Sequence, residues 1–281
     1  MDDTDDEQRR LWNGPSGRVW VEEQATLDAM FKPLEDLVVA RTPVRPGCRV
    51  LDIGCGTGSL TVALARRVGV EGRCTGIDIS APMLEAARAR AARANMPARF
   101  LQADPQRHAF EPASLDALVS RFGVMFFSDP VRAFANMREG AADDARLSLV
   151  VWRSGADNPF MTTAERAAAP LLPDLPAREP NAPGQFAFAD RDRVRRILEA
   201  SGWTDVALEP VDAPCAFPES GLERYFTGLG PVGRVLRETD DATRARVVDT
   251  VRDAFTPYVR GGEVRFTAAC WLVSGRAAAR R

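Results

Sequence analysis

The chain has 281 residues, of which 45% are hydrophobic and 27% charged, a composition typical of a globular protein with a substantial core. Its 37 basic and 39 acidic side chains give a formal net charge of −2, so no global field favours nucleic acid or an anionic membrane as a partner. From the acidic first residues, the lack of an apolar run of ~20 residues and five cysteines without a CxxC pair, we expect a cytoplasmic protein with no signal peptide, reduced thiols and no metal site.

Short apolar runs alternate with helical patterns between residues 49 and 154. Helical patterns follow the first, second and fourth runs, and Ser80 and Pro82 are typical of the start of the second helix. The apolar runs predict strands at 49–53, 74–79, 99–103, 115–119 and 147–152. Because strands that alternate with helices build βαβ units, we expect an α/β fold with a doubly wound, mainly parallel sheet covered on both faces.

The alternation breaks after Arg153. Residues 154–189 contain six prolines and a short helical stretch near 162–169. Loops of this length are more often lids or binding segments than simple connections, so we predict a lid or substrate insertion here.

The α/β pattern then resumes. Asp190 caps the next predicted helix and Gly202 ends it, and a sixth strand is marked by residues 206–208. A second insertion at about 211–262 carries another helix, and the run 266–273 completes a seven-stranded sheet. The sequence therefore predicts one domain with two helical insertions.

A glycine-rich loop, Asp-Ile-Gly-Cys-Gly-Thr-Gly at residues 52–58, lies between the first strand and the first helix. Glycines there allow a tight turn and let a ligand approach the backbone, and the helix start offers free N–H groups. Asp78 follows Gly58 by twenty residues, at the end of the second strand. A carboxylate in that position can accept hydrogen bonds from both hydroxyls of a ribose, so the pattern predicts an adenosine-containing cofactor.

The spacing of the glycines separates two cofactors. Dinucleotide sites use G-x-G-x-x-G, whereas this loop reads G-x-G-x-G after the acid Asp52. A carboxylate beneath the loop repels a pyrophosphate and attracts a cationic centre. The loop therefore favours S-adenosylmethionine over NAD.

The same segments resemble motifs of the class I S-adenosylmethionine-dependent methyltransferases. Residues 50–58 resemble the first motif and 76–84 the second, while 103–106 and 120–127 resemble the third and fourth in the ubiquinone/menaquinone-type (methyltransferase 11-like) branch. The likeness covers about residues 46–153 and extends more loosely to the last strand. It implies a Rossmann-like methyltransferase fold, S-adenosylmethionine as cofactor and S-adenosylhomocysteine as product. The family's Pro-Gly-Gly turn before the fifth strand is missing, which questions the geometry of that turn.

The resemblance also implies roles for single residues. The three glycines of the loop would line the methionine and ribose, Asp78 would bind the ribose hydroxyls and Ile79 would pack on adenine. Asp104 would accept a hydrogen bond from the adenine amino group, and Ser120 would contribute backbone contacts with Phe122 close by. The residues that we assign to the cofactor site are Trp12, Asp52, Gly54, Gly56, Gly58, Asp78, Ile79, Met83, Asp104, Pro105, Ser120 and Phe122.

Aromatic and basic residues near the expected ligand edge are candidates for an acceptor pocket. Trp12 and Trp20 precede the first strand, where they either shield the sulfonium from water or pin a helix to the sheet. Other residues follow the fourth strand or end the fifth, and each can serve as core instead. The acceptor-pocket candidates are Trp20, Met125, Phe126, Trp152 and Arg153.

No catalytic residue is assigned, and His108 and Arg121 are the two candidates. His108 is the only histidine, but it lies on a loop expected near the adenine, where a loop-anchoring role is the alternative. Arg121 and Arg153 can bind a carboxylate or phenolate, or can pair with a neighbouring acid.

We predict methyl transfer to oxygen, nitrogen or carbon of a small acceptor by in-line displacement, which needs alignment and exclusion of water rather than a metal. Two alternatives stay open: a cyclase or decarboxylase that uses the sulfonium electrostatically, and a non-catalytic partner protein. A homodimer also stays open. The predicted division is an N-terminal helical cap at 1–45, a cofactor-binding core at 46–153, a lid at 154–189 and the rest of the core at 190–281.

Overall fold

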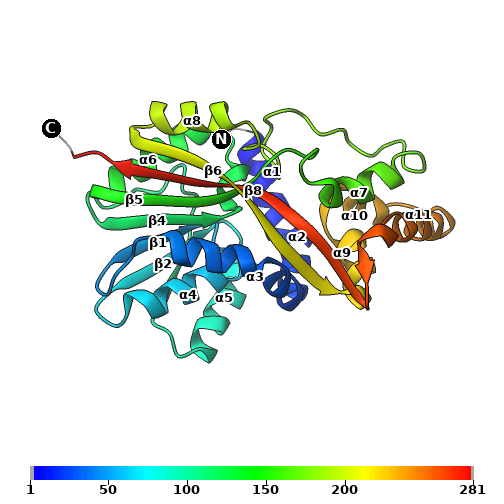
Figure 1. Cartoon of the computed structure of the whole chain (residues 1–281), viewed down its shortest axis with the longest axis horizontal. Coiled ribbons are helices and arrows are strands. Elements are labelled where there is room, and N and C mark those ends of the chain that lie inside the picture. The colour runs from blue at the N-terminus through cyan, green and yellow to red at the C-terminus, as the bar shows by residue number, and fades with distance from the viewer. Residues whose placement is uncertain (1–2, 280–281) are drawn as a thin grey trace.

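A central β-sheet runs through the molecule, and helices cover both of its faces (Figure 1). The computed structural model describes residues 3–279. The strands lie in the order β3-β2-β1-β4-β5-β8-β6, and the short strand β7 pairs with β8 beside this path. The strands are β1 Arg49–Ile53, β2 Arg73–Asp78, β3 Ala98–Gln102, β4 Leu115–Arg121, β5 Ala141–Trp152, β6 Trp203–Pro218, β7 Val259–Arg260 and β8 Glu263–Ala277.

Most of the strand pairs are parallel. The pairs from β3 across to β5 are parallel, whereas β8 runs antiparallel to both β5 and β6. The predicted α/β class, with a doubly wound, mainly parallel sheet of seven strands, is confirmed. The two-residue strand β7 is an addition that the sequence pattern does not indicate.

The helices that connect parallel strands lie on opposite faces of the sheet. Helix α4 (Ser59–Val68) leads from β1 to β2, and α6 (Pro130–Gly140) leads from β4 to β5, in the opposite direction along the sheet. Right-handed crossovers therefore place them on different faces. Helices α3 (Gln24–Arg41) and α5 (Ala81–Arg93) flank α4, while α8 (Arg191–Ala200) packs beside α6. The order reverses between β1 and β4, and such a point leaves a crevice at the carboxyl ends of the strands.

Side-chain caps start the helices where the sequence predicts them. Ser80 Oγ accepts a hydrogen bond from the Met83 N–H at 3.4 Å, one residue before α5 begins. Asp190 Oδ1 accepts one from the Arg193 N–H at 2.9 Å, one residue before α8 begins. Each cap satisfies a backbone donor that the first turn of a helix leaves without a partner.

Strands β5, β6 and β8 extend well beyond their predicted bounds, and β5 begins at Ala141 instead of residue 147. Strands β6 and β8 stay in register from Trp203 opposite Ala277 to Pro218 opposite Glu263, so β6 covers the first part of 211–262. Because β6 contains three prolines, its sequence resembles that of a loop. Because β6 is an edge strand and these prolines stand four residues apart, each missing N–H can face the side without a partner strand.

The long β6–β8 pair projects past the sheet and carries a group of helices (Figure 1). The division of the chain into cap, core, lid and remainder stays a prediction. The remaining helices are α1 Asp3–Asn13, α2 Pro15–Glu22, α7 Pro159–Ala168, α9 Leu222–Gly228, α10 Gly230–Leu236 and α11 Asp241–Ala254.

The segment where the family turn is missing contains no separate loop. Helix α6 ends at Gly140 and β5 begins at Ala141. The pairing of β4 with β5 is irregular near this point, and Asp144 has a positive φ of 63°. The strand thus absorbs the turn as a local irregularity.

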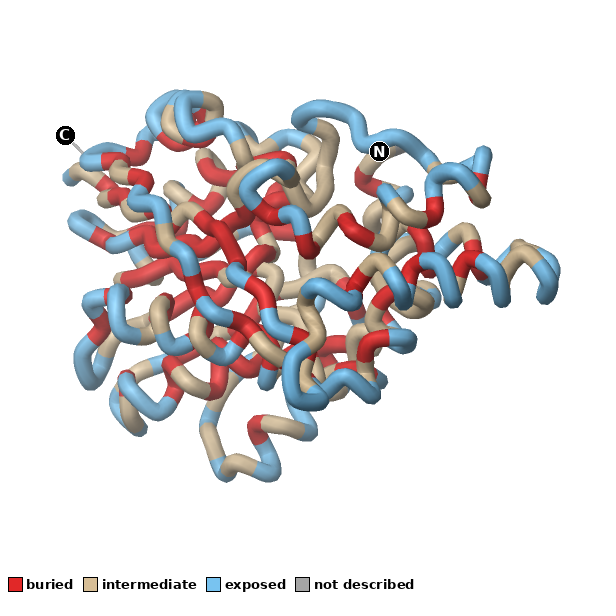
Figure 2. The backbone as a smooth tube through the Cα atoms, turned by 45° about the vertical axis from the view of Figure 1, so that its right-hand side comes forward, coloured by how far each residue is buried: buried red, intermediate tan, exposed pale blue. Residues whose placement is uncertain are grey.

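Buried residues follow the central strands, and exposed residues lie on the outer helix faces (Figure 2). Within residues 3–279, no helix combines the length and the apolar character needed to cross a membrane.

Candidate active site

A cavity of about 1160 Å³ opens at the carboxyl ends of β1, β2 and β4. Its wall is formed by the loops after these strands, by the N-terminal helices, by residues of 155–187 after β5 and by the helices between β6 and β8. The predicted site residues that line it are Trp12, Trp20, Gly54, Gly56, Asp78, Ile79, Met83, Asp104, Pro105, Arg121, Phe122, Met125, Phe126 and Trp152. Asp52, Gly58, His108, Ser120 and Arg153 lie outside its wall.

The glycines of the loop serve two different purposes. Gly54 has a φ of +62°, and a Cβ there would come within 2.6 Å of the Gly123 Cα, so two backbone segments meet at the cavity wall. Gly56 has a φ of +52°, and a Cβ there would find only the Met83 sulfur, at 3.5 Å. A Cβ on Gly58 would meet the Ala87 Cβ at 2.9 Å, because this glycine packs against α5. The first two glycines shape the cavity, and the third lets the helix approach the loop.

The Asp78 carboxylate faces the cavity from the end of β2. Its Oδ2 accepts the Gly56 N–H at 2.8 Å and its Oδ1 accepts the Ser80 N–H at 2.9 Å, which fixes the side chain against the glycine loop. Burial raises the pKa of Asp78, and the backbone hydrogen bonds offset only part of that rise. This carboxylate joins the two loops that border the predicted ribose position.

The Asp52 carboxylate lies behind the glycine loop in the protein interior. It is 1% exposed, and its Oδ2 accepts a hydrogen bond from the Thr61 hydroxyl at 2.6 Å. Burial raises the pKa of Asp52 to about 7, although the Thr61 hydrogen bond lowers it in part. Any action of Asp52 on a ligand is therefore electrostatic and passes through the loop.

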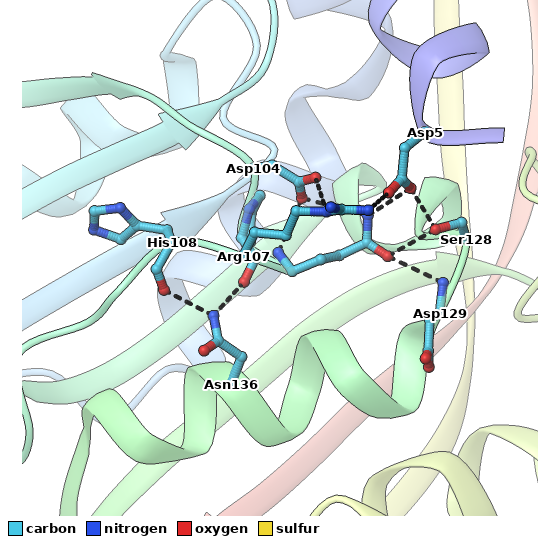
Figure 3. Close-up of polar contacts among 9 residues, drawn as sticks. Asp5, Asp104, Arg107, His108, Ser128, Asp129 and Asn136 are labelled. Carbon is cyan, nitrogen blue, oxygen red and sulfur yellow. Dashed lines mark hydrogen bonds and ion pairs between the residues drawn. The ribbon is translucent and has the colours of Figure 1, made fainter. Parts of the chain in front are cut away.

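The loop after β3 supplies a second carboxylate to the cavity. Asp104 is 9% exposed, and its Oδ1 accepts the Gln106 N–H at 2.9 Å and the Gln106 amide at 3.3 Å (Figure 3). Ile79 and Met83 give this part of the wall its apolar surface. Gln106 also lines the cavity; the sequence analysis includes it in the motif-like segment 103–106 but assigns it no role in the site.

Aromatic rings from the N-terminal helices and the fourth-strand loop lie together in the wall. The Trp12 ring centroid lies 6.1 Å from that of Trp20 and 5.1 Å from that of Phe126, both in edge-to-face geometry. Asn13 fixes the end of α1, since its amide donates to the Ile79 carbonyl at 3.1 Å and its oxygen accepts the Ala81 N–H at 2.9 Å. Both tryptophans thus line the cavity, and Trp12 also belongs to a helix that is anchored to the loop after β2, whereas Trp20 lies on the next helix, α2.

A second aromatic group lies at the ends of β4 and β5. The Phe122 and Trp152 rings stack at 4.6 Å with an interplanar angle of 4°, and the Phe31 ring meets them edge-on at 5.3 and 5.9 Å. Ser120 lies behind them, where its hydroxyl donates to the Ile53 carbonyl at 2.7 Å and accepts the Gly123 N–H at 3.1 Å. Ser120 therefore shapes the wall from behind.

His108 and Arg153 are held away from the cavity. The His108 ring packs edge-on against the Phe110 ring, with their centroids 4.7 Å apart. The backbone carbonyl of His108 accepts a hydrogen bond from the Asn136 amide (Figure 3). Arg153 forms ion pairs with Asp157 and Asp212, each at 3.1 Å. Pairing with neighbouring acids is thus the arrangement that the structure gives Arg153.

Arg121 does line the cavity, but its guanidinium group is partnered. It donates to the Ser59 hydroxyl at 3.1 Å and to the Phe31 carbonyl at 3.4 Å, and it lies 3.9 Å from the Glu35 carboxylate. These bonds tie the end of β4 to α3 and to the start of α4.

The far wall of the cavity comes from residues of 154–189, the segment predicted as a lid or substrate insertion, and from the helices between β6 and β8; the sequence pattern singled out no individual residue in either segment. Phe160 stacks on Phe266 at 4.0 Å, and the Tyr225 hydroxyl lies 3.3 Å from the Met161 sulfur. Burial raises the pKa of Tyr225. Phe160 and Met161 are adjacent, but Tyr225 and Phe266 are distant from them and from each other in the sequence, so no sequence signal could have grouped the four.

Glu165 and Arg178 add a charged pair to the same wall. The Arg178 Nε donates to the Glu165 Oε2 at 2.8 Å, and the guanidinium lies 4.7 Å from the Phe186 ring centre.

Among residues 3–279 we find no group of three histidine, cysteine or acidic side chains arranged to hold a metal ion.

Comparisons with known proteins agree with this geometry. Residues 50–143 match the family model described as a methyltransferase domain. Over 282 residues, covering 90% of this chain and 93% of the relative, the sequence is 27% identical to nocamycin O-methyltransferase of Saccharothrix syringae. It is 30% identical over 131 residues to 2-phytyl-1,4-naphtoquinone methyltransferase of Trichormus variabilis, covering 46% of this chain and 57% of that protein.

Solved structures share the fold. The Haemonchus contortus phosphoethanolamine N-methyltransferase 2 in complex with S-adenosyl-L-methionine superposes with a TM-score of 0.60 and 15% identity. The superposition covers 99% of this chain and 61% of that one. At this identity the likeness concerns the fold.

Proposed function

We propose that the chain is a class I S-adenosylmethionine-dependent methyltransferase of small molecules and that it methylates an oxygen, nitrogen or carbon atom of a partly apolar metabolite. One observation carries the proposal: the glycine turn with Asp78 and the aromatic wall of Trp20, Phe122 and Trp152 border the same cavity. The methyl donor and the methyl acceptor can therefore lie side by side in this cavity.

The residues at the strand ends fit an adenosyl group. The Asp78 carboxylate lines the cavity for the ribose hydroxyls, and Asp104 lines it for an exocyclic amino group. Ile79 and Met83 offer apolar contact to a purine. Gly56 leaves its side of the loop open, because a Cβ there has a single neighbour within 4 Å.

The chain's own contribution to the reaction is alignment and exclusion of water. Bound S-adenosylmethionine supplies an electrophilic methyl group on a sulfonium. The rings of Trp12, Trp20 and Phe126 cover the cavity beside the glycine loop and keep water from it. The Phe122 and Trp152 stack gives a flat surface on which an apolar acceptor can be oriented.

The single histidine does not contact the cavity, so the acceptor finds no imidazole base there. The side chains available to act as a general base are carboxylates, and the Glu165 carboxylate already forms an ion pair with Arg178. An acceptor that loses its proton readily suits this cavity best, since transfer then needs no strong base. The name of the Saccharothrix relative supports oxygen as the first accepting atom to test.

Product mass tests the proposal. The protein is incubated with S-adenosylmethionine and a panel of small phenols, carboxylic acids, enols and amines, and the products are analysed by mass spectrometry. We expect one acceptor to gain one methylene unit as S-adenosylhomocysteine is released. A product formed without that gain would favour the cyclase or decarboxylase alternative. Binding of the cofactor without turnover of any acceptor would favour a non-catalytic partner protein.

A further inference from the structure

Asp5, on the first turns of α1, connects that helix to the loop after β3. It is 7% exposed, and its carboxylate accepts hydrogen bonds from Arg107 at 2.5 Å, from the Gln106 amide at 3.3 Å and from the Ser128 hydroxyl (Figure 3). Burial raises the pKa of Asp5, but the bonds from Ser128, Arg107 and Gln106 outweigh burial and hold that pKa below its usual value. Asp5 is therefore a charged, fully engaged group at the cavity wall.

Gln106 transmits this contact to Asp104. The Gln106 Nε2 lies 3.3 Å from both the Asp5 Oδ1 and the Asp104 Oδ1, so one amide joins the two carboxylates. Its Oε1 accepts a hydrogen bond from the Asp129 N–H at 3.0 Å and lies 3.0 Å from the Ser128 Oγ, whose single proton is donated to Asp5. With both ends of the amide bonded, Gln106 cannot turn without breaking several contacts, and it holds the Asp104 Oδ1 in place.

The other end of α1 is anchored as well. The Ser80 hydroxyl donates to the Trp12 carbonyl at 2.7 Å, and Asn13 bonds the backbone of Ile79 and Ala81. Helix α1 thus bridges the loop after β2 and the loop after β3, across the part of the cavity that Ile79 and Asp104 line. Asp5 is the attachment on the Asp104 side.

We propose that Asp5 is a positioning residue for purine recognition, because it closes α1 over the purine end of the cavity and fixes the Asp104 carboxylate through Gln106. The inference rests on the proposed function, in which Asp104 accepts a hydrogen bond from the adenine amino group. The Asp104 Oδ1 is engaged by Gln106, while Arg107 Nε lies 4.0 Å from the Oδ2. A fixed carboxylate discriminates between an amino and an oxo substituent, and a mobile one does so poorly.

Isothermal titration with two probes tests this inference. The probes are S-adenosylhomocysteine and S-inosylhomocysteine, in which an oxo group replaces the purine amino group. We expect the wild-type protein to prefer the adenosyl probe by about tenfold or more. In Asp5→Ala we expect affinity for the adenosyl probe to fall by about tenfold, while affinity for the inosyl probe changes less than about threefold. The preference should therefore largely disappear.

Asp6→Ala is the matched control, since Asp6 stands next on the same helix, does not line the cavity and has no side-chain hydrogen bond or ion pair in the described part of the chain. It should keep the wild-type preference. Ser128→Ala, which removes the hydrogen bond to Asp5 and the hydroxyl contact with Gln106, serves as a second, milder variant should Asp5→Ala fail to fold. It should reduce the preference in the same direction.

Three results would overturn the inference. Equal loss of affinity for both probes would mean that Asp5 only supports the fold. Unchanged affinities in both Asp5→Ala and Ser128→Ala would mean that the contacts do not position Asp104. A wild-type protein that binds neither probe would overturn the proposed function as well, whereas the first two results leave it intact.

Discussion

The two ends of the cavity are built by different means. At the end that we propose for the cofactor, backbone turns and carboxylates lie at the ends of β1, β2 and β3, as Gly54, Asp78 and Asp104 do. At the opposite end, the wall is made of aromatic side chains such as Phe160 and Tyr225, which come from separate helices. The first end depends on backbone conformation and fixed polar groups, and the second depends on packing.

Because the two ends are built differently, we expect affinity for the cofactor and stability of the aromatic end to respond to different substitutions. A backbone site tolerates almost no added atom, because neither segment can move without changing the turn. A packed aromatic cluster loses stability when a ring is removed, but a ligand held elsewhere keeps its contacts.

The largest effect is expected from Gly54→Ala. The added Cβ would lie 2.6 Å from the Gly123 Cα, at a φ of +62°. Both segments line the cavity, so we expect affinity for S-adenosylhomocysteine to fall about a hundredfold or more in a calorimetric titration. Gly69→Ala is the matched control, since Gly69 has a φ of +68° with nothing within 4 Å and lies away from the cavity. Equal affinities in the two variants would contradict this account of the turn.

Phe160→Ala should act on the other end. Phe160 is 2% exposed and stacks on Phe266 at 4.0 Å. We expect the free energy of unfolding to fall by about 3–5 kcal/mol in urea titrations, because a buried ring is removed. Affinity for S-adenosylhomocysteine should stay within about threefold of wild type. A parallel loss of that affinity would break the distinction between the two ends.

Asp52→Asn should change how stability depends on pH. Burial raises the pKa of Asp52 from 3.8 to about 7, so the folded protein binds this proton more tightly than the unfolded chain does. The contribution to stability is complete below pH 3.8 and is lost as the pH rises through 7. The variant has no such proton, so its free energy of unfolding relative to wild type should rise by up to about 4 kcal/mol between pH 4 and pH 8. Parallel pH profiles for the two proteins would show that folding does not shift the pKa of Asp52.

Tyr225→Phe should have the smallest effect. The substitution removes only the hydroxyl that lies 3.3 Å from the Met161 sulfur and keeps the ring. We expect thermal unfolding to report a loss of no more than about 1 kcal/mol, with unchanged affinity for S-adenosylhomocysteine. A larger loss of stability would mean that the hydroxyl contributes more than this single contact.

The same contrast explains how far the sequence could go. The alternation of strands with helices predicts the fold class, and the glycine loop and Asp78, which are local patterns with a known spacing, predict the end of the cavity that we propose for the cofactor. Gly58 looks the same as Gly54 in the sequence, yet it packs against Ala87 instead of the cavity. The roles of the two glycines differ because helix α5 packs against Gly58, which the sequence alone does not reveal.

Other features depend on contacts between distant residues. The bonds of Asp5 to Gln106 and Ser128 join three ordinary polar residues across more than a hundred positions. The length of β6 was hidden by prolines that an edge strand accommodates. The Arg153 guanidinium could bind an anion, but it is paired with Asp157 and Asp212, and the sequence gives no sign that Asp212 lies beside it.

The central claim is that the cavity beside Gly54 and Asp78 binds an adenosyl sulfonium compound and not a dinucleotide. Calorimetric titration of the wild-type protein with S-adenosylhomocysteine, and separately with NAD, measures this directly. The account predicts saturable, one-to-one binding of S-adenosylhomocysteine and no heat of binding from NAD. Binding of NAD alone would contradict it.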